Sequence, residues 1–174
     1  CTEESDLNPI SLYAQHKVEV EAELMHLPGA TSFRLATVFG MSPRMRLDLL
    51  VNDLTNRALV DRSVVLFEAD FVRNYVHVRD VSRAIMWAIA NPDLVVGQVF
   101  NVGLTEANLS KRQLCEAIQQ HVPGFMFTEA AAGRDPDQRN YVVSNEKIES
   151  AGFRFEMGLH RGLAELVKGL PTLS

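Results

Sequence analysis

The sequence predicts an α/β fold in which buried parallel strands alternate with helices. Short apolar runs typical of buried strands are separated by segments whose apolar residues recur at helical spacing. Strands that are connected through a helix run parallel, because the helix carries the chain back to the edge of the sheet where the first strand began. The 174 residues are 47% apolar, which is enough to bury one sizeable core.

The first elements are marked by clear start and stop signals. A helix is predicted over residues 11 to 25, where Ser11 is a suitable N-cap and Pro28-Gly29 ends the helical pattern. A buried strand follows from Ser32 to Val38 and closes at Phe39-Gly40. The next turn leads into a helix over residues 47 to 59.

The alternation continues to the C-terminus. Two short β-rich runs precede a helix that starts at Asp80 and stops before Asn91-Pro92, and we expect the Asp80 carboxylate to cap that helix at a gain of about 1 kcal/mol. The other predicted elements are strands over residues 63–68, 75–78, 98–102 and 125–129 and helices over residues 110–120, 145–151 and 161–167.

Composition argues against nucleic acid and membranes as partners. The formal net charge is -5, and no basic run is interleaved with aromatic residues. The longest apolar stretches, such as Ile85 to Ala90, fall well short of the ~20 residues that cross a bilayer. The acidic start is unlike a secretory signal, so we expect a cytoplasmic protein.

The cysteines and histidines do not predict a metal site or a disulfide framework. Cys1 and Cys115 are the two cysteines, and neither has a second Cys or a His at metal-ligand spacing. The five histidines are scattered along the chain. Cys115 lies on a predicted helix, where we expect it to be a small buried apolar residue.

Tyr13 and Lys17 are the most informative pair of side chains. Residues four apart share one face of a helix, so the phenol and the ammonium can reach the same reactant. A nearby cation favours the phenolate form of a tyrosine, which suits general acid/base chemistry. On spacing alone, a solvated surface pair is the alternative.

The surroundings of this pair favour the functional interpretation. The segment from Glu3 to Glu21 resembles the stretch around the active-site helix of the extended short-chain dehydrogenase/reductase family, which includes the nucleotide-sugar epimerases and dehydratases. Four further segments resemble that family in the same order: Arg34–Gly40 (its Arg-x-x-Asn-x-Tyr-Gly strand end), Arg73–Val81 (its Arg-Asp-Tyr-x-His-Val-x-Asp-Val block), Val99–Gly103, and the end pattern over 143–166.

The resemblance refines the predicted fold to the C-terminal part of a Rossmann-like parallel sheet with a smaller mixed α/β substrate-binding lobe. It implies that residues 1–40 are a remnant of the dinucleotide-binding domain that holds the active-site helix and the following strand. Residues 41–79 would be a segment of the substrate lobe, residues 80–103 a return to the Rossmann-like layer, and residues 104–174 the C-terminal substrate lobe.

The cofactor contacts implied by the resemblance are partial. Tyr13 would be the acid/base, Lys17 would bind the nicotinamide ribose, and Ala36 would lie near the nicotinamide. Family members begin with a Gly-rich turn that cradles the dinucleotide pyrophosphate, whereas no glycine precedes Gly29 in this chain. We therefore expect an N-terminal half to be missing and apolar surface to be left bare.

Three residues are implied as substrate contacts. Thr37 would face the substrate where many members carry an Asn, although a packed strand residue is an equal alternative for both Thr37 and Ala36. Arg73 would clamp the diphosphate of a nucleotide sugar, because a guanidinium matches phosphate oxygens in pairs. An ion pair with Asp70 or Asp80 is the alternative for Arg73. Arg134 resembles a second diphosphate contact of the family, in a loop whose residue order is altered here.

The resemblance implies the C-terminal part of an NAD(P)-dependent nucleotide-sugar epimerase, dehydratase or reductase. NAD and NADP are not distinguished, because the residue that reads the ribose belongs to the missing half.

We expect the isolated chain to be inactive and to have negligible dinucleotide affinity. The expected partners are a nucleotide sugar, the missing half and a second copy of the chain. A non-catalytic nucleotide-sugar-binding or interaction module is the alternative. The positive charge of Ser42–Arg46 would lie near the nucleotide, or else in a solvated loop.

Overall fold

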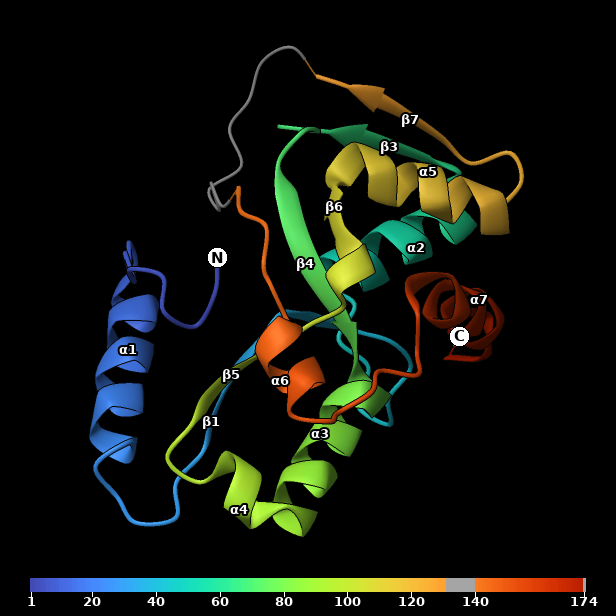
Figure 1. Cartoon of the computed structure of the whole chain (residues 1–174). Coiled ribbons are helices and arrows are strands. Elements are labelled where there is room, and N and C mark those ends of the chain that lie inside the picture. The colour runs from blue at the N-terminus through green and yellow to red at the C-terminus, as the bar shows by residue number, and fades with distance from the viewer. Residues whose placement is uncertain (131–139, 174) are drawn as a thin grey trace.

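The structure, a computed structural model, describes residues 1–130 and 140–173 and has a mixed α/β fold with parallel strand pairs, as the sequence predicts (Figure 1). The α-helices are α1 Leu12–Leu24, α2 Leu50–Val60, α3 Val78–Ala90, α4 Pro92–Val95, α5 Lys111–His121, α6 Glu146–Ser150 and α7 Leu159–Gly169. The strands are β1 Ser32–Leu35, β2 Thr37–Phe39, β3 Ser63–Leu66, β4 Val72–His77, β5 Val99–Val102, β6 Asn108–Ser110 and β7 Met126–Glu129. Two short 3-10 helices, Thr105–Ala107 and Leu170–Leu173, complete the described elements.

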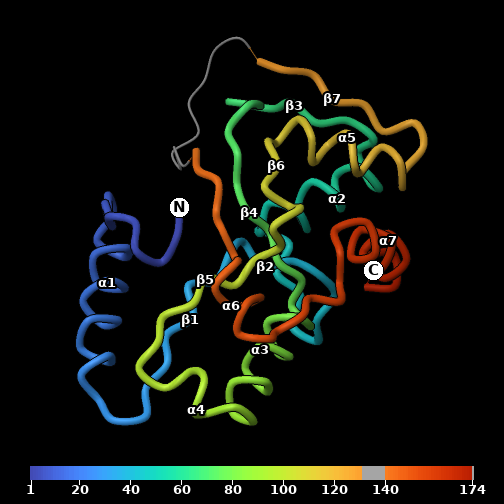
Figure 2. The backbone as a smooth tube through the Cα atoms, viewed as in Figure 1, coloured from blue at the N-terminus to red at the C-terminus, as the bar shows by residue number. Residues whose placement is uncertain are grey.

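The strand pairs are mostly parallel, as the alternation of elements predicts. β1 pairs with β5, β2 with β4 and β3 with β7, all in parallel register. β6, which was not among the predicted strands, pairs antiparallel with β4. The backbone trace shows β1 beside β5 and β2 beside β4 (Figure 2).

The predicted strand from Ser32 to Val38 is in fact two strands. The Ala36 N–H donates to the carbonyl oxygen of Val102 beyond the end of the β1–β5 pair, and the next residue, Thr37, stands opposite Tyr75 of β4. The chain therefore changes partner at Ala36. Apolar patterning could not reveal this change, because both partner strands lie far along the sequence.

Two apolar cores flank β4. Successive side chains of a strand point to opposite faces, so Tyr75 joins one core and Val76 the other. The first core is formed mainly with α2, α5 and α7, and the second with α3, α6 and β5. Both faces of β4 are therefore packed against apolar side chains.

Asp80 does not cap a helix, contrary to the sequence prediction. Helix α3 begins at Val78, and the Arg79 N–H donates to Nδ1 of His77, the N-cap residue, at 3.2 Å. The Asp80 side chain is fully buried and accepts hydrogen bonds from the backbone N–H groups of Glu156 and Met157. The backbone that binds this carboxylate is more than 70 residues away in sequence, so propensity rules for helix starts cannot predict the contact.

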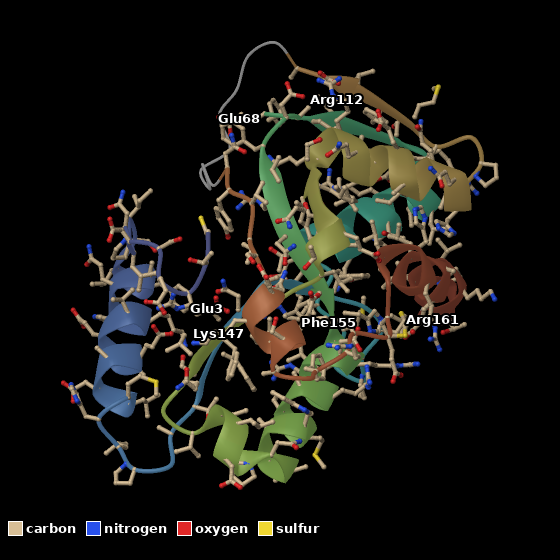
Figure 3. All side chains as sticks on the ribbon, in the orientation of Figure 1. Glu3, Glu68, Arg112, Lys147, Phe155 and Arg161 are labelled. Atoms are coloured by element: carbon tan, nitrogen blue, oxygen red, sulfur yellow. The ribbon has the colours of Figure 1, made fainter. Side chains whose placement is uncertain are left out.

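Helix α1 is poorly covered by the described chain and lies at one side of the molecule (Figure 1). None of its residues is buried. Its tie to β1 is polar, because Glu21 accepts hydrogen bonds from Ser32 and from the Arg34 guanidinium. The segment that precedes α1 is held to β5, because the Asn101 N–H donates to the Glu3 carboxylate at 2.7 Å (Figure 3).

Among the described residues, no helix is both long enough and apolar enough to cross a bilayer.

Candidate active site

Tyr13 and Lys17 lie on one face of α1, as their spacing predicts. Ser11 begins the helix by accepting a hydrogen bond from the Ala14 N–H at 3.2 Å, which fixes the first turn and the direction of Tyr13. Lys17 Nζ stands 5.4 Å from the centroid of the Tyr13 ring. The Tyr13 side chain is 70% exposed, so its hydroxyl is open to a ligand.

A cavity of about 670 Å³, which we call the strand cavity, brings together four predicted site residues. Those four are Tyr13, Ala36, Thr37 and Arg73. They come from α1, from the point where the chain changes partner, from β2 and from β4. Residues 60 positions apart in sequence thus line one space, although the sequence predicted their roles separately.

A second cavity, of about 540 Å³, lies between α1 and β1, and we call it the helix cavity. Lys17 lines it, together with Glu21 and Arg34. Tyr13 and Leu35 line both cavities. Tyr13 therefore stands at the boundary of two spaces, with Lys17 on the side of the helix cavity.

Close packing of backbone holds the wall of the strand cavity in place. A Cβ atom at Gly103 would lie 1.7 Å from Oδ1 of Asn74 and 3.0 Å from Cβ of Ala36, so only glycine fits there. The Asn74 amide donates to the carbonyl oxygen of Leu104 at 2.6 Å, which ties β4 to the chain beyond β5. Arg73, next to Asn74 on β4, is 5% exposed.

Asp70 and Asp80, the carboxylates considered as partners of Arg73, each form an ion pair with another arginine, and Arg73 also has an interaction partner in the protein. Asp80 pairs with Arg83 at 2.8 Å, and Asp70 pairs with Arg112 at 2.9 Å. Arg134, the remaining predicted substrate contact, lies outside the described residues.

Some residues of the strand cavity were not predicted as site residues, namely Arg46, Asp48, Asp53 and Tyr141. The sequence offered a signal for Arg46 alone, through the basic segment that contains it. Arg46 and Asp48 form an ion pair of 2.6 Å, and this guanidinium lowers the pKa of the Asp48 carboxyl to about 2. Tyr141 had no sequence signal, because tertiary contacts alone bring it to this wall.

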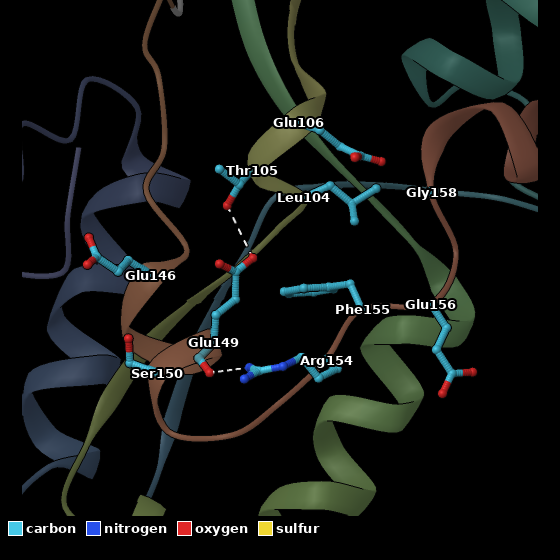
Figure 4. Close-up of a pocket in the computed structure, with 10 residues that line it drawn as sticks. All are labelled: Leu104, Thr105, Glu106, Glu146, Glu149, Ser150, Arg154, Phe155, Glu156 and Gly158. Carbon is cyan, nitrogen blue, oxygen red and sulfur yellow. Dashed lines mark hydrogen bonds between the residues drawn. The ribbon is translucent and has the colours of Figure 1, made fainter.

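A further cavity, of about 750 Å³, contains none of the predicted site residues (Figure 4). Glutamates dominate its polar lining, and one of them, Glu149, accepts a hydrogen bond from the Thr105 hydroxyl at 3.2 Å. Within the described part of the chain, no group of three or more His, Cys, Asp or Glu side chains is arranged to hold a metal ion. Because the strand cavity brings together four of the predicted site residues, it is the candidate active site.

Comparison with known proteins identifies the family. The model of the NAD dependent epimerase/dehydratase family matches residues 1–103, which is more than half of the chain. The chain belongs to this family of α/β proteins, in agreement with the resemblance seen in the sequence.

Solved structures with the same fold come from several bacteria. The dTDP-glucose 4,6-dehydratase of Bacillus anthracis, in complex with NAD, is 22% identical with a TM-score of 0.81, and the match covers 99% of this chain and 56% of that one. The UDP-glucose 4-epimerase of Thermotoga maritima, with UDP-glucose, is 26% identical with a TM-score of 0.73, and the match covers 93% and 52% of the two chains. The dTDP-glucose 4,6-dehydratase of Streptomyces venezuelae is 23% identical with a TM-score of 0.79, over 99% and 54%. The chain thus spans little more than half the length of these proteins.

Proposed function

We propose that this chain is the acid/base and substrate-binding part of an NAD(P)-dependent nucleotide-sugar epimerase, dehydratase or reductase. The observation that carries the proposal is the position of Tyr13, which lines both the strand cavity and the helix cavity, with Lys17 beside its ring. Hydride-transfer chemistry on a sugar alcohol needs one proton-transfer group between the substrate and the dinucleotide. Tyr13 occupies such a boundary.

In this mechanism the Tyr13 hydroxyl exchanges a proton with a hydroxyl of the sugar in the strand cavity. The Lys17 ammonium, 5.4 Å from the ring centroid, stabilises the phenolate that forms when Tyr13 gives up its proton. Thr37 offers a hydroxyl to the sugar from the facing strand. Arg73 clamps the diphosphate, and Arg134 is proposed as a second contact with it.

The dinucleotide, when bound, supplies the hydride acceptor or donor. The residues present fit only its nicotinamide end, because Lys17 lines the helix cavity and Ala36 lies on the wall next to Tyr13. A Gly-rich turn for the pyrophosphate would have to come from other polypeptide, since no glycine precedes Gly29. We therefore propose that the isolated chain is inactive and binds NAD with negligible affinity.

Helix α1 offers an exposed apolar surface that a partner could cover. Helix α1 carries several apolar side chains that are at least two-fifths exposed, and these are Leu12, Tyr13, Val20 and Leu24. We propose that the dinucleotide-binding half, or a second copy of the chain, covers this helix in the functional assembly. A clean monomer in sedimentation, with the dinucleotide-binding half present, would remove the homodimer from the proposal.

A non-catalytic nucleotide-sugar-binding module is the second candidate. It is favoured by the strand cavity, which gathers Tyr13, Thr37 and Arg73 from three different elements of this chain. Such a module would bind nucleotide sugars with the same residues, but its function would not require proton transfer by Tyr13.

Two experiments separate the candidates. In calorimetry, the isolated chain should bind a nucleotide sugar saturably and NAD negligibly, and micromolar NAD binding would overturn this view of the isolated chain. After addition of a dinucleotide-binding half, turnover should appear and should fall about 10²- to 10⁴-fold in Tyr13→Phe. The exposed neighbour His16 provides a control, His16→Ala, which should leave turnover unchanged. Turnover that survives Tyr13→Phe would refute the acid/base role, and its absence in every variant would favour the binding module.

A further inference from the structure

The loop between β2 and α2 forms part of the wall of the strand cavity. This loop, residues 40–49, contains neither helix nor strand. Three of its residues line the cavity, and these are Arg46, Asp48 and Leu49. A loop lacks the repeating backbone hydrogen bonds of a helix or a sheet, so it has more conformational freedom than the elements that it connects. The position of this wall therefore depends on contacts between the loop and other parts of the chain.

Asn52, in the first turn of α2, holds this loop at two points. Its side chain is 2% exposed. Its carbonyl oxygen accepts a hydrogen bond from the Gly40 N–H at 3.1 Å, and its amide nitrogen donates to the carbonyl oxygen of Arg46 at 2.9 Å. An amide side chain offers both an acceptor and a donor, so it can satisfy one N–H group and one carbonyl group together. A single buried side chain thus connects the start of the loop to a residue that lines the cavity.

The first of these two points is itself closely packed. Gly40 has a φ of +115°, and a Cβ atom there would lie 2.3 Å from Nε2 of His77. His77, the last residue of β4, is fully buried, and its ring packs edge-on against Phe39 at a centroid distance of 5.3 Å. The Gly40 backbone therefore rests on the buried end of β4. Through Asn52, the backbone at Arg46 is connected to this packed region.

From these contacts we infer that Asn52 is a positioning residue, which holds the β2–α2 loop in the conformation that binds a nucleotide sugar. The inference rests on the proposed function and extends it to a residue that does not itself line the strand cavity. A loop that already has its bound conformation loses less freedom when the ligand binds, so the affinity is higher. Without the Asn52 amide, the ligand would have to order Arg46 and its neighbours as it binds.

A purely structural role is the alternative for Asn52, and Thr55 provides the matched comparison. Thr55 is also buried on α2, and its hydroxyl donates to the carbonyl oxygen of Val51 at 2.7 Å. This hydrogen bond stays within the helix and does not involve residues 40–49. Thr55→Val therefore removes a buried polar group from the same helix without releasing the loop, whereas Asn52→Leu removes a buried polar group and releases it.

The test measures the binding of UDP-glucose and of dTDP-glucose to the 174-residue chain by calorimetry, under conditions in which urea titration shows that each variant is folded. Asn52→Leu keeps a similar volume and removes both hydrogen bonds, so the Kd of the ligand that the wild-type chain binds should rise about tenfold or more. Asn52→Asp keeps the oxygen that accepts from Gly40 but removes the donor to Arg46, and it should also weaken binding. Thr55→Val should retain the wild-type affinity.

Hydrogen exchange gives a second measurement that a purely structural role would not change. In Asn52→Leu, the backbone amides between Gly40 and Leu49 should exchange about tenfold faster or more than in the wild-type chain, whereas Thr55→Val should keep the wild-type rates in this segment. Addition of the ligand should protect the loop more strongly in Asn52→Leu than in the wild-type chain, because only the variant has to order the loop upon binding.

The possible outcomes separate the inference from the proposed function. Equal affinities of the wild-type chain and Asn52→Leu would show that the inference is wrong, while the proposed function stands. An equal loss of affinity in Thr55→Val would mean that general destabilisation is responsible, and the inference would again be wrong. If Asn52→Leu does not fold, Asn52→Asp decides by the same comparison. Binding of neither nucleotide sugar by the wild-type chain would overturn the proposed substrate site, and the inference with it.

Discussion

The buried carboxylate of Asp80 should be a major source of stability. It joins α3 to the segment before α7, because the Glu156 and Met157 N–H groups donate to it at 2.8 to 3.2 Å. Arg83 donates to it as well, at 2.8 Å. The side chain is fully buried, so water cannot easily replace it. Asp80→Ala therefore tests whether this residue is a link between distant segments or a helix cap.

The structure sets the size of the expected loss. Removal of the carboxylate leaves two backbone N–H groups without a partner, at about 1–3 kcal/mol each if they stay buried. The Arg83 guanidinium adds little to this loss, because its side chain is 37% exposed and it also binds Glu156. The sum is about 2–6 kcal/mol. A helix cap would cost about 1 kcal/mol.

Urea denaturation gives the free energy of unfolding directly, and the fluorescence of Trp87, which packs against Phe153 at a centroid distance of 5.7 Å, reports on the region. The control Asp61→Ala changes an exposed aspartate and should alter stability by less than about 0.5 kcal/mol. A loss of about 1 kcal/mol or less in Asp80→Ala would refute the role as a link.

Three further predictions concern other parts of the chain. Glu21→Gln should raise hydrogen exchange across α1, because the Arg34 hydrogen bonds that lower the pKa of Glu21 tie this helix to β1. In the wild type, the Glu21–Arg34 interaction stabilises the protein fully above the ordinary glutamate pKa of 4.5, and this stabilisation is lost as the pH falls through the lowered pKa of Glu21. Gly162→Ala should destabilise the protein by about 1–3 kcal/mol in urea titrations, because a Cβ atom there would lie 2.5 Å from the Phe39 ring. A thiol reagent should modify Cys115 only after unfolding, because the side chain is fully buried and burial raises the pKa of its thiol to about 12.

Each of these predictions has an internal comparison. Glu23 is exposed on the same helix, and Glu23→Gln should leave exchange unchanged. At Gly169, in the same helix, the three atoms nearest to an added Cβ all belong to the flexible Met41 side chain, so Gly169→Ala should cost less. The exposed Cys1 should react in the native protein. Equal exchange in the two Glu variants, equal stability in the two Gly variants, or modification of both native thiols would each contradict the corresponding prediction.

The sequence by itself determined the features that depend on local periodicity. Tyr13 and Lys17 share a face because a helix repeats every 3.6 residues, and the structure places them so. The cap at Ser11, the parallel pairing of most strands and the burial of Cys115 follow from equally local signals. The motif from Arg73 onward was visible in the sequence, although its place on the wall of a cavity was not.

Only the tertiary structure decided which distant residues meet. The change of strand partner at Ala36, the capture of Asp80 by the backbone near Met157, and the arrival of Tyr141 and Asp48 at the strand cavity all depend on contacts between segments far apart in sequence. Apolar patterning reports whether a residue is buried, but not against which segment, because many pairings bury the same surface equally well. The set of side chains that lines the strand cavity is therefore a property of the folded chain.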